Sequence, residues 1–259
     1  MSESSQTLAR GLKLLDLVAD GREGAPVRDL AAAMRLPRSI VQRLLYTLEA
    51  EGYLERHPSG VGYRLAIKLW GLGCAAIRRF DVRDVARPAL EELAARTSEM
   101  TKIGVLDRHE VVYVDGIDCP QPVRAYVPIG GRAPAHSVAT GKAILAFLPP
   151  ERLADIASTM KRYTRRTVVE RDAFAAELAQ IRRRGFAVNR GEWEDGVGAI
   201  AAPVLDARGE AVASIGIILP VIRLSAAKVN QMAGWTVAAA ADVSRRLGHR
   251  DEPRVKRAG

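Results

Sequence analysis

The sequence has few of the residues that mark secreted or membrane-spanning proteins. Its 259 residues include two cysteines, Cys74 and Cys119, whose separation does not fit a metal-ligand pair and indicates reduced thiols. No apolar run approaches the roughly 20 residues that a membrane span needs. The N-terminus also lacks the basic and then apolar order of a signal peptide. We therefore expect a cytoplasmic protein with no membrane partner.

Patterns of common catalytic sites are missing as well. The chain has no Gly-x-Ser-x-Gly elbow and no His-Glu-x-x-His, and its four histidines are too scattered to suggest a metal site. The segment "VATGKA" differs from a phosphate-binding loop, because His136 stands where the first glycine is required and Ala143 where Ser or Thr is required. We predict no catalytic residue, no metal and no cofactor. Lys142 is then a structural residue or a charge near a pocket mouth.

Positive charge is abundant but does not single out the N-terminal region. The net charge is +9, which favours polyanionic partners. Residues 1–68 hold ten Lys and Arg against eight Asp and Glu, a net +2, whereas residues 161–184 hold eight against three. The second run is best explained as a solvated face. A case for nucleic-acid binding must therefore rest on sequence motifs.

The N-terminal pattern is three helices followed by a hairpin. Apolar spacing predicts a helix up to the polar "DGREG" at 20–24, a second helix "VRDLAAAM" after Pro26, and a third between Pro37 and Gly52. Extended pieces at 53–56 and 62–65 flank a Pro/Ser/Gly turn. This order is typical of a winged helix-turn-helix.

The third helix has two different faces. Its apolar residues Ile40, Leu44 and Leu48 share one side, and arginine, glutamine and serine occupy the other. Arg suits guanine and Gln suits adenine in the major groove, and the first turns of a recognition helix meet the bases. The alternative is an ordinary solvated face, which the order of the surrounding elements disfavours. The predicted DNA-binding residues are Arg28, Arg38, Ser39, Gln42, Arg43, Tyr46, Arg56, His57 and Arg64.

The rest of the chain alternates between strands and helices. We expect a connecting helix at 67–80, a long amphipathic helix at 82–97, and then strands that include "VRAYVPIG" at 123–130. Helices are predicted over "HSVATGKAILAFL" and at the C-terminal end. The fold class is α+β. The predicted domains are 1–66 (winged helix-turn-helix), 67–80 (linker helix), 81–248 (α/β) and a basic, disordered tail at 249–259.

Several segments together resemble the IclR family of bacterial transcription regulators. In the first half they are "TLARGLKLLDLVADG" and "VRDLAAAMRLPRSIVQRLLYTLEAEGYL", and in the second "GRAPAHSVATGKAILAFLP", "RRRGFAVN" and "GAIAAPVLDARGEAVASIGI". The resemblance covers roughly residues 6–248. It implies a GAF- or profilin-like effector-binding domain after the winged helix. It also implies assembly into a homodimer or a dimer of dimers on operator DNA.

The resemblance further implies a pocket for a small metabolite. Backbone amides near Ala139 and Thr140 would face its carboxylate, and His136 would contact it or be a satisfied core histidine. Asn189 stands where relatives commonly have an acidic residue, and Ala199 stands where they frequently have a cysteine. Gly216 and Ile218 stand where some relatives that bind small oxo-acids have serines. Plain sheet packing is an equally good explanation for Gly216 and Ile218. These departures predict an organic acid with an apolar or aromatic body as the effector. The implied effector-binding residues are His136, Ala139, Thr140, Asn189, Ala199, Gly216 and Ile218.

The sequence thus predicts a ligand-responsive, DNA-binding transcription regulator of a catabolic operon, more often a repressor in this family. The main alternative is an enzyme with a catalytic α/β domain and an appended winged helix, which the missing catalytic patterns disfavour. A ligand-independent architectural DNA binder is a third possibility. It predicts a strongly basic N-terminal half, and a net charge of +2 does not provide that.

Overall fold

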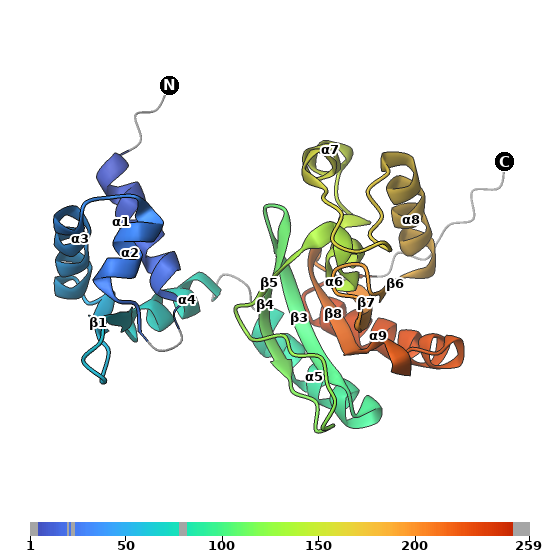
Figure 1. The fold of residues 1–259 in the computed structure, drawn as a ribbon. Coiled ribbons are helices and arrows are strands. Elements are labelled where there is room, and N and C mark those ends of the chain that lie inside the picture. Colours follow the sequence, from blue (N-terminus) through green and yellow to red (C-terminus); the bar gives the residue numbers. More distant parts are fainter. Residues whose placement is uncertain (1–4, 20, 22–23, 78–81, 251–259) are drawn as a thin grey trace. The chain divides into compact units, whose positions relative to one another are not determined.

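The described residues form two compact units. The computed structural model describes residues 5–19, 21, 24–77 and 82–250, with one unit ending at residue 77 and the other starting at residue 82 (Figure 1). Each unit encloses its own hydrophobic core. Residues 78–80 of the predicted linker helix and 251–259 of the predicted tail lie outside the described residues.

The N-terminal unit is the predicted winged helix-turn-helix. A short connection after α2 turns the chain through Arg35, which has a left-handed φ of 52°, and α3 begins directly after Pro37. A two-stranded antiparallel hairpin, the wing, follows α3. The elements are α1 (Gln6–Ala19), α2 (Val27–Met34), α3 (Arg38–Ala50), β1 (Leu54–Arg56), β2 (Tyr63–Leu65) and α4 (Lys68–Ile77).

The core of this unit joins the helices to the wing. Leu14 and Val18 of α1 pack with Val41 and Leu45 of α3 and with Tyr63 of β2, and all five side chains are buried. Each such side chain contributes roughly 1.5–3 kcal/mol by leaving water. The position of the wing is therefore fixed by the same core that holds α3.

A close backbone contact also anchors the wing. Ala25 and Tyr63 exchange backbone hydrogen bonds of 3.0 and 3.2 Å, which extends the hairpin by one bridge. Gly62 precedes this bridge with φ +76°, and a Cβ atom there would lie 2.4 Å from the backbone of Ala25. Only glycine fits both the conformation and the space.

The C-terminal unit is built on one antiparallel sheet of six strands. The strand order is β5-β4-β3-β8-β7-β6, and every neighbouring pair is antiparallel. Strands β7 and β8 come from one hairpin and lie beside β3 and β4 from another. The strands are β3 (Met100–Asp107), β4 (Glu110–Ile117), β5 (Arg132–Pro134), β6 (Ala187–Arg190), β7 (Val197–Leu205) and β8 (Ala211–Pro220).

Helices cover both faces of this sheet (Figure 1). Two long helices, α5 (Val82–Thr97) and α9 (Ala226–Arg246), form one core with one face. The helices α6 (Ala139–Leu145), α7 (Pro150–Thr159) and α8 (Arg171–Arg184) form a second core on the other face. Two short 3-10 turns, η1 (Ala135–Ser137) and η2 (Val221–Arg223), precede α6 and α9. The predicted α+β class is confirmed.

Two predictions about the C-terminal unit are wrong in detail. Residues 124–128 of the predicted strand "VRAYVPIG" have no regular secondary structure, because prolines at 122 and 128 cannot donate to a sheet ladder. The edge of β4 pairs instead with Arg132–Pro134. The helix predicted from His136 begins only at Ala139, since residues 135–137 form the 3-10 turn η1.

Candidate functional site

The outward face of α3 carries side chains that are free to meet a partner. Arg38, Ser39, Arg43 and Tyr46 are exposed. Within the described part of the chain, the side chains of Arg38 and Arg43 make no hydrogen bond and no ion pair. These two guanidinium groups lie on the first two turns of the helix, where a recognition helix meets base edges.

Gln42 is placed differently from its neighbours. It is half-buried, and its side-chain nitrogen donates a hydrogen bond of 3.2 Å to the hydroxyl of Tyr63. Tyr63 is completely buried, and burial raises the pKa of its phenol. The amide of Gln42 therefore connects α3 to the wing. Only its side-chain oxygen and its second N–H group remain available to contact a base.

Arg56 is part of the same connection. Its guanidinium pairs with Glu49 of α3 at 3.1 Å and lies 4.3 Å from the centre of the Tyr63 ring. We use the name wing joint for the four residues Gln42, Glu49, Arg56 and Tyr63. The joint fixes the angle between helix and hairpin, so Arg56 has an internal role that the sequence did not reveal.

The other predicted contacts are surface groups with weak local partners. Arg64 pairs with Glu55 at 2.6 Å and Arg28 with Asp29 at 3.0 Å, and all four side chains are exposed to solvent. The Nδ1 atom of His57 lies 2.7 Å from the hydroxyl oxygen of Ser59. Exposed ion pairs of this kind contribute about 0–1 kcal/mol. Phosphate oxygens can replace such partners at little cost.

The C-terminal unit contains a small hollow between β4, α6 and the loop that connects β6 to β7. Its volume is about 30 Å³, and its walls are mostly aromatic and aliphatic. We name it the aromatic hollow. Its walls are formed by Tyr113, Tyr126, Val127, Val138, Ala139, Thr140, Asn189, Trp193, Glu194, Val197, Ala199 and Ile218.

Five of the seven predicted effector residues line this hollow, and two do not. His136 is buried elsewhere: its Nε2 atom lies 2.9 Å from the carbonyl oxygen of Lys161, and desolvation lowers the pKa of the imidazole. A Cβ atom at Gly216 would lie 2.9 Å from Cγ2 of Thr140. The structure thus places Gly216 where it allows α6 to pack against β8.

Three polar residues of the aromatic hollow, Tyr113, Thr140 and Asn189, are hydrogen-bonded within the protein. The hydroxyl groups of Tyr113 and Thr140 lie 3.1 Å apart, and burial raises the pKa of the Tyr113 phenol. The side chain of Asn189 donates to the carbonyl oxygen of Ser137 and accepts from the backbone N–H groups of Gly191 at 2.8 Å and Glu192 at 3.2 Å. Asn189 therefore holds the start of the β6–β7 loop in place.

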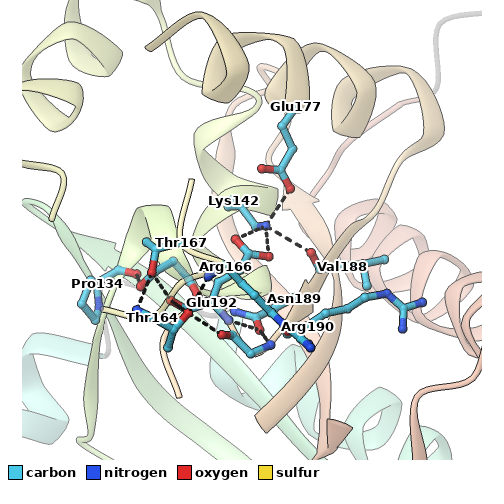
Figure 2. A network of polar contacts seen from close by, with 12 residues as sticks. Pro134, Lys142, Thr164, Arg166, Thr167, Glu177, Val188, Asn189, Arg190 and Glu192 are labelled. Atoms are coloured by element: carbon cyan, nitrogen blue, oxygen red, sulfur yellow. Dashed lines mark hydrogen bonds and ion pairs between the residues drawn. The ribbon is translucent and has the colours of Figure 1, made fainter. Parts of the chain in front are cut away.

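A buried ion cluster contacts the same loop (Figure 2). Lys142 of α6 is fully buried, and its ammonium contacts Glu192 at 2.6 and 2.7 Å, Glu177 of α8 at 2.6 Å and the carbonyl oxygen of Val188 at 3.1 Å. Burial raises the pKa of Glu192, and the charge of Lys142 opposes that rise. Thr167 also donates to the backbone oxygen of Glu192 at 2.6 Å.

Among the described residues, no group of His, Cys, Asp or Glu side chains has the arrangement of a metal site. Cys119 is buried and carries a free thiol. No helix in the described ranges is both long and apolar enough to cross a membrane.

Comparison with protein families assigns both units. The family described as bacterial transcriptional regulator IclR C-terminal matches residues 74–245, and the IclR helix-turn-helix domain matches residues 7–58. Together the two matches span most of the chain. This chain belongs to the IclR family.

Individual IclR-family proteins are similar over almost the full length. The HTH-type transcriptional regulator XynR of Escherichia coli (strain K12) is 31% identical over 246 residues, which is 94% of this chain and 98% of XynR. The transcriptional repressor IclR of the same organism is 29% identical over 247 residues, which is 94% of this chain and 90% of the IclR chain. The chain is accordingly a transcriptional regulator with a DNA-binding helix-turn-helix domain and an effector-binding domain.

A solved IclR-family structure adds a ligand. An IclR homologue from Microbacterium hydrocarbonoxydans, complexed with 4-hydroxybenzoate, aligns with a TM-score of 0.82 at 26% identity and covers 93% of this chain and 99% of that one. The ligand belongs to that protein.

Seven of the twelve residues that line the aromatic hollow were not among the predicted effector residues, and four of these seven are aromatic or charged. Tyr113, Tyr126, Trp193 and Glu194 come from a strand, an irregular segment and a loop, and no local pattern connects them. The one available signal was the aromatic Trp193 within the polar loop "RGEWEDG", because an aromatic residue in such a loop needs a surface to cover.

Proposed function

We propose that this protein is a repressor of a catabolic operon that releases its operator when an aromatic organic acid binds in the aromatic hollow. Residues 1–66 would bind DNA, residues 67–80 would link the units, and residues 81–248 would bind the effector. The observation that carries the proposal is the wall composition. Tyr113, Tyr126 and Trp193 make the wall largely aromatic, Tyr113 and Thr140 supply one pair of hydroxyl groups, and the one charged residue in the wall, Glu194, is exposed.

This composition suits a ring with a polar substituent better than a very small oxo-acid. Aromatic side chains contact a flat ring over a large area, and the Tyr113–Thr140 pair can accept or donate one further hydrogen bond. The bound 4-hydroxybenzoate of the similar IclR homologue has this chemistry. The protein would act by shifting between DNA-competent and DNA-incompetent populations, without catalysis.

The hollow must widen before it takes such a ligand. Typical small-molecule sites measure about 300–1,000 Å³, whereas this hollow measures about 30 Å³. Tyr126 is the most exposed of its aromatic residues and belongs to the irregular segment 124–128. We infer that movement of this segment admits the effector.

For the DNA-binding side, we propose that Arg38, Ser39 and Arg43 read bases and that Arg28, His57 and Arg64 contact phosphates. Gln42, Tyr46 and Arg56 would act mainly by placing these groups. Self-association would supply two such surfaces for an operator with two-fold symmetry. Large apolar side chains exposed on the N-terminal unit support this proposal: Leu8, Leu12, Ile67, Trp70 and Leu72.

The test combines DNA binding with ligand binding. Gel shifts on the intergenic DNA beside the protein's own gene should show a complex that 4-hydroxybenzoate dissociates, while glyoxylate and pyruvate have little effect. Calorimetric titration of the variants Thr140→Val and Tyr113→Phe should show weaker 4-hydroxybenzoate binding by about tenfold, since each loses a hydrogen bond. Tight binding of glyoxylate alone would contradict the aromatic effector. Absence of any DNA complex would contradict the regulator role at this site.

A further inference from the structure

The C-terminal unit contains two buried lysines with very different surroundings. Lys142 is fully buried and has four oxygen contacts between 2.6 and 3.1 Å. The side chain of Lys102 is only 2% exposed, yet its ammonium has one contact, Asp118 at 3.4 Å. An ammonium carries three donors, and a buried charge is costly unless it is paired. Lys102 therefore has unused donor capacity.

The partner of Lys102 is also a weak one. The Asp118 side chain is 70% exposed, so water screens its charge. A distance of 3.4 Å is at the outer limit of a hydrogen bond. Lys142 shows that this fold can surround a buried lysine with closely placed carboxylates, and the structure does not do so for Lys102.

A glycine on the neighbouring strand makes room for the Lys102 side chain on the sheet. In the strand register, Lys102 of β3 lies opposite Gly116 of β4 and Gly216 of β8. A Cβ atom at Gly116 would lie 2.3 Å from Cδ of Lys102. The aliphatic part of the lysine thus lies over Gly116, which directs the ammonium toward Asp118.

A second hollow lies at this point. It has a volume of about 330 Å³ and is lined by Lys102, Arg87, the strand end 116–118 and the segment 126–129. The guanidinium of Arg87 contacts Glu91 at 2.8 Å and Asp115 at 3.1 Å. Asp115 is also 3.7 Å from Arg83, so two arginines share that buried carboxylate. The only carboxylate in contact with Lys102 among the described residues is the exposed Asp118.

This Lys102 hollow adjoins the aromatic hollow. Tyr126 and Val127 line both, so the irregular segment separates the two spaces. The volume of the Lys102 hollow fits a small molecule, whereas the aromatic hollow is nearly closed.

We propose that the Lys102 hollow is a second binding site of this unit, and that it takes a small oxyanion whose oxygen atoms accept the free donors of Lys102. The oxyanion is either the carboxylate of an organic acid or a phosphate group. Binding displaces Asp118 toward solvent. This costs little free energy, because the Asp118 side chain is already mostly exposed and its contact with Lys102 is weak. The proposal does not depend on which effector the aromatic hollow takes.

Equilibrium dialysis of the full chain against radiolabelled inorganic phosphate and radiolabelled acetate tests this site directly. The wild-type chain should bind one of them saturably, and the tighter probe identifies the phosphate or the carboxylate source. Lys102→Met keeps the aliphatic stem and removes the charge, so the dissociation constant should rise at least about tenfold. Lys102→Arg should retain binding. Lys228→Met, at an exposed lysine of α9, removes the same charge elsewhere and should leave the dissociation constant unchanged.

Asp118→Asn provides a variant that keeps the fold and should gain affinity. The substitution removes the negative charge of Asp118, which competes with the oxyanion for Lys102. Oxyanion binding should therefore tighten about two- to fivefold, which corresponds to the strength of an exposed ion pair. A purely structural Lys102 predicts no such gain. Three results would overturn the proposal: no saturable binding of either probe, equal binding by Lys102→Met, or weaker binding by Asp118→Asn.

Discussion

The outward face of α3 and the aromatic hollow present their functional groups in opposite ways. Arg38, Ser39 and Arg43 extend into solvent, and the two arginines have no side-chain partner among the described residues. In the hollow, Tyr113 and Thr140 are hydrogen-bonded to each other and Asn189 to the backbone. A partner of α3 replaces only water. A ligand of the hollow must also replace contacts within the protein.

The difference explains how each region can be specific. A surface of unpaired arginines attracts any polyanion, so its specificity depends on the accurate placement of a few side chains. The wing joint provides that placement in the N-terminal unit. The hollow excludes most molecules by its shape and by the ion cluster that holds its loop. The predictions below disturb these two arrangements.

We expect the largest effect from Lys142→Met. It leaves the carboxylates of Glu177 and Glu192 without their counter-ion, and breaking a buried ion pair typically costs about 3–5 kcal/mol. Urea unfolding of the C-terminal unit, followed by tryptophan fluorescence, measures the loss. Lys102→Met is the matched control and should lose much less, because Lys102 has one weak contact. A loss for Lys142→Met as small as the one expected for Lys102→Met would show that the ion cluster does not stabilise the unit.

Arg43→Ala should have the next largest effect. Loss of a bidentate contact to guanine removes about 1–3 kcal/mol of discrimination, so the variant should lose preference for the operator over scrambled DNA. Gel shifts with both DNAs measure the ratio. Arg64→Ala is the control from the wing. Arg64→Ala should weaken binding to both DNAs evenly and reduce the salt dependence of binding. If Arg64→Ala instead lost the operator preference and Arg43→Ala weakened binding to both DNAs evenly, Arg64 would read bases and Arg43 would contact phosphates.

Tyr63→Phe tests the wing joint. The variant removes only the hydroxyl group that accepts from Gln42, so the N-terminal unit should lose about 0.5–1.5 kcal/mol of unfolding free energy. The operator preference should fall with it, because Gln42 and the wing lose their common anchor. Unchanged stability together with improved operator preference would mean that Gln42 reads a base itself and is released by the substitution.

The smallest effect should come from His136, through pH. Desolvation and then the charge of Lys142 hold its pKa below the ordinary value of 6.5, so the folded protein keeps the imidazole neutral. Below about pH 6.5 the unfolded chain takes up the proton first, and the unfolding free energy therefore falls as the pH decreases. His136→Gln should remove this part of the pH dependence. A variant with an unchanged pH profile would contradict the assignment.

The N-terminal unit could be predicted from the sequence almost completely. Its helices and hairpin follow local patterns, and the apolar face of α3 and the glycine at 52 were visible in the sequence. The wing joint could not be predicted from the sequence, because Gln42 and Tyr63 are 21 residues apart and their contact depends on how the hairpin packs.

The effector region was predictable only in outline. Family motifs indicated Ala139, Thr140, Asn189, Ala199 and Ile218, all of which line the aromatic hollow. The aromatic walls come together from β4, the irregular segment and the β6–β7 loop. The segment 123–130 contains several β-branched and aromatic residues, which favour a strand, but the prolines at 122 and 128 and the competing pairing of β5 prevent that structure.

The closed state of the aromatic hollow also limits how fast the protein can respond. A volume of about 30 Å³ admits no aromatic acid until the segment that carries Tyr126 moves. If that opening precedes binding, the observed association rate rises with ligand concentration and then levels off at the rate of opening. The rate of opening would then set the timing of derepression. The apparent affinity for the ligand would decrease in proportion to the fraction of molecules in which the hollow is open.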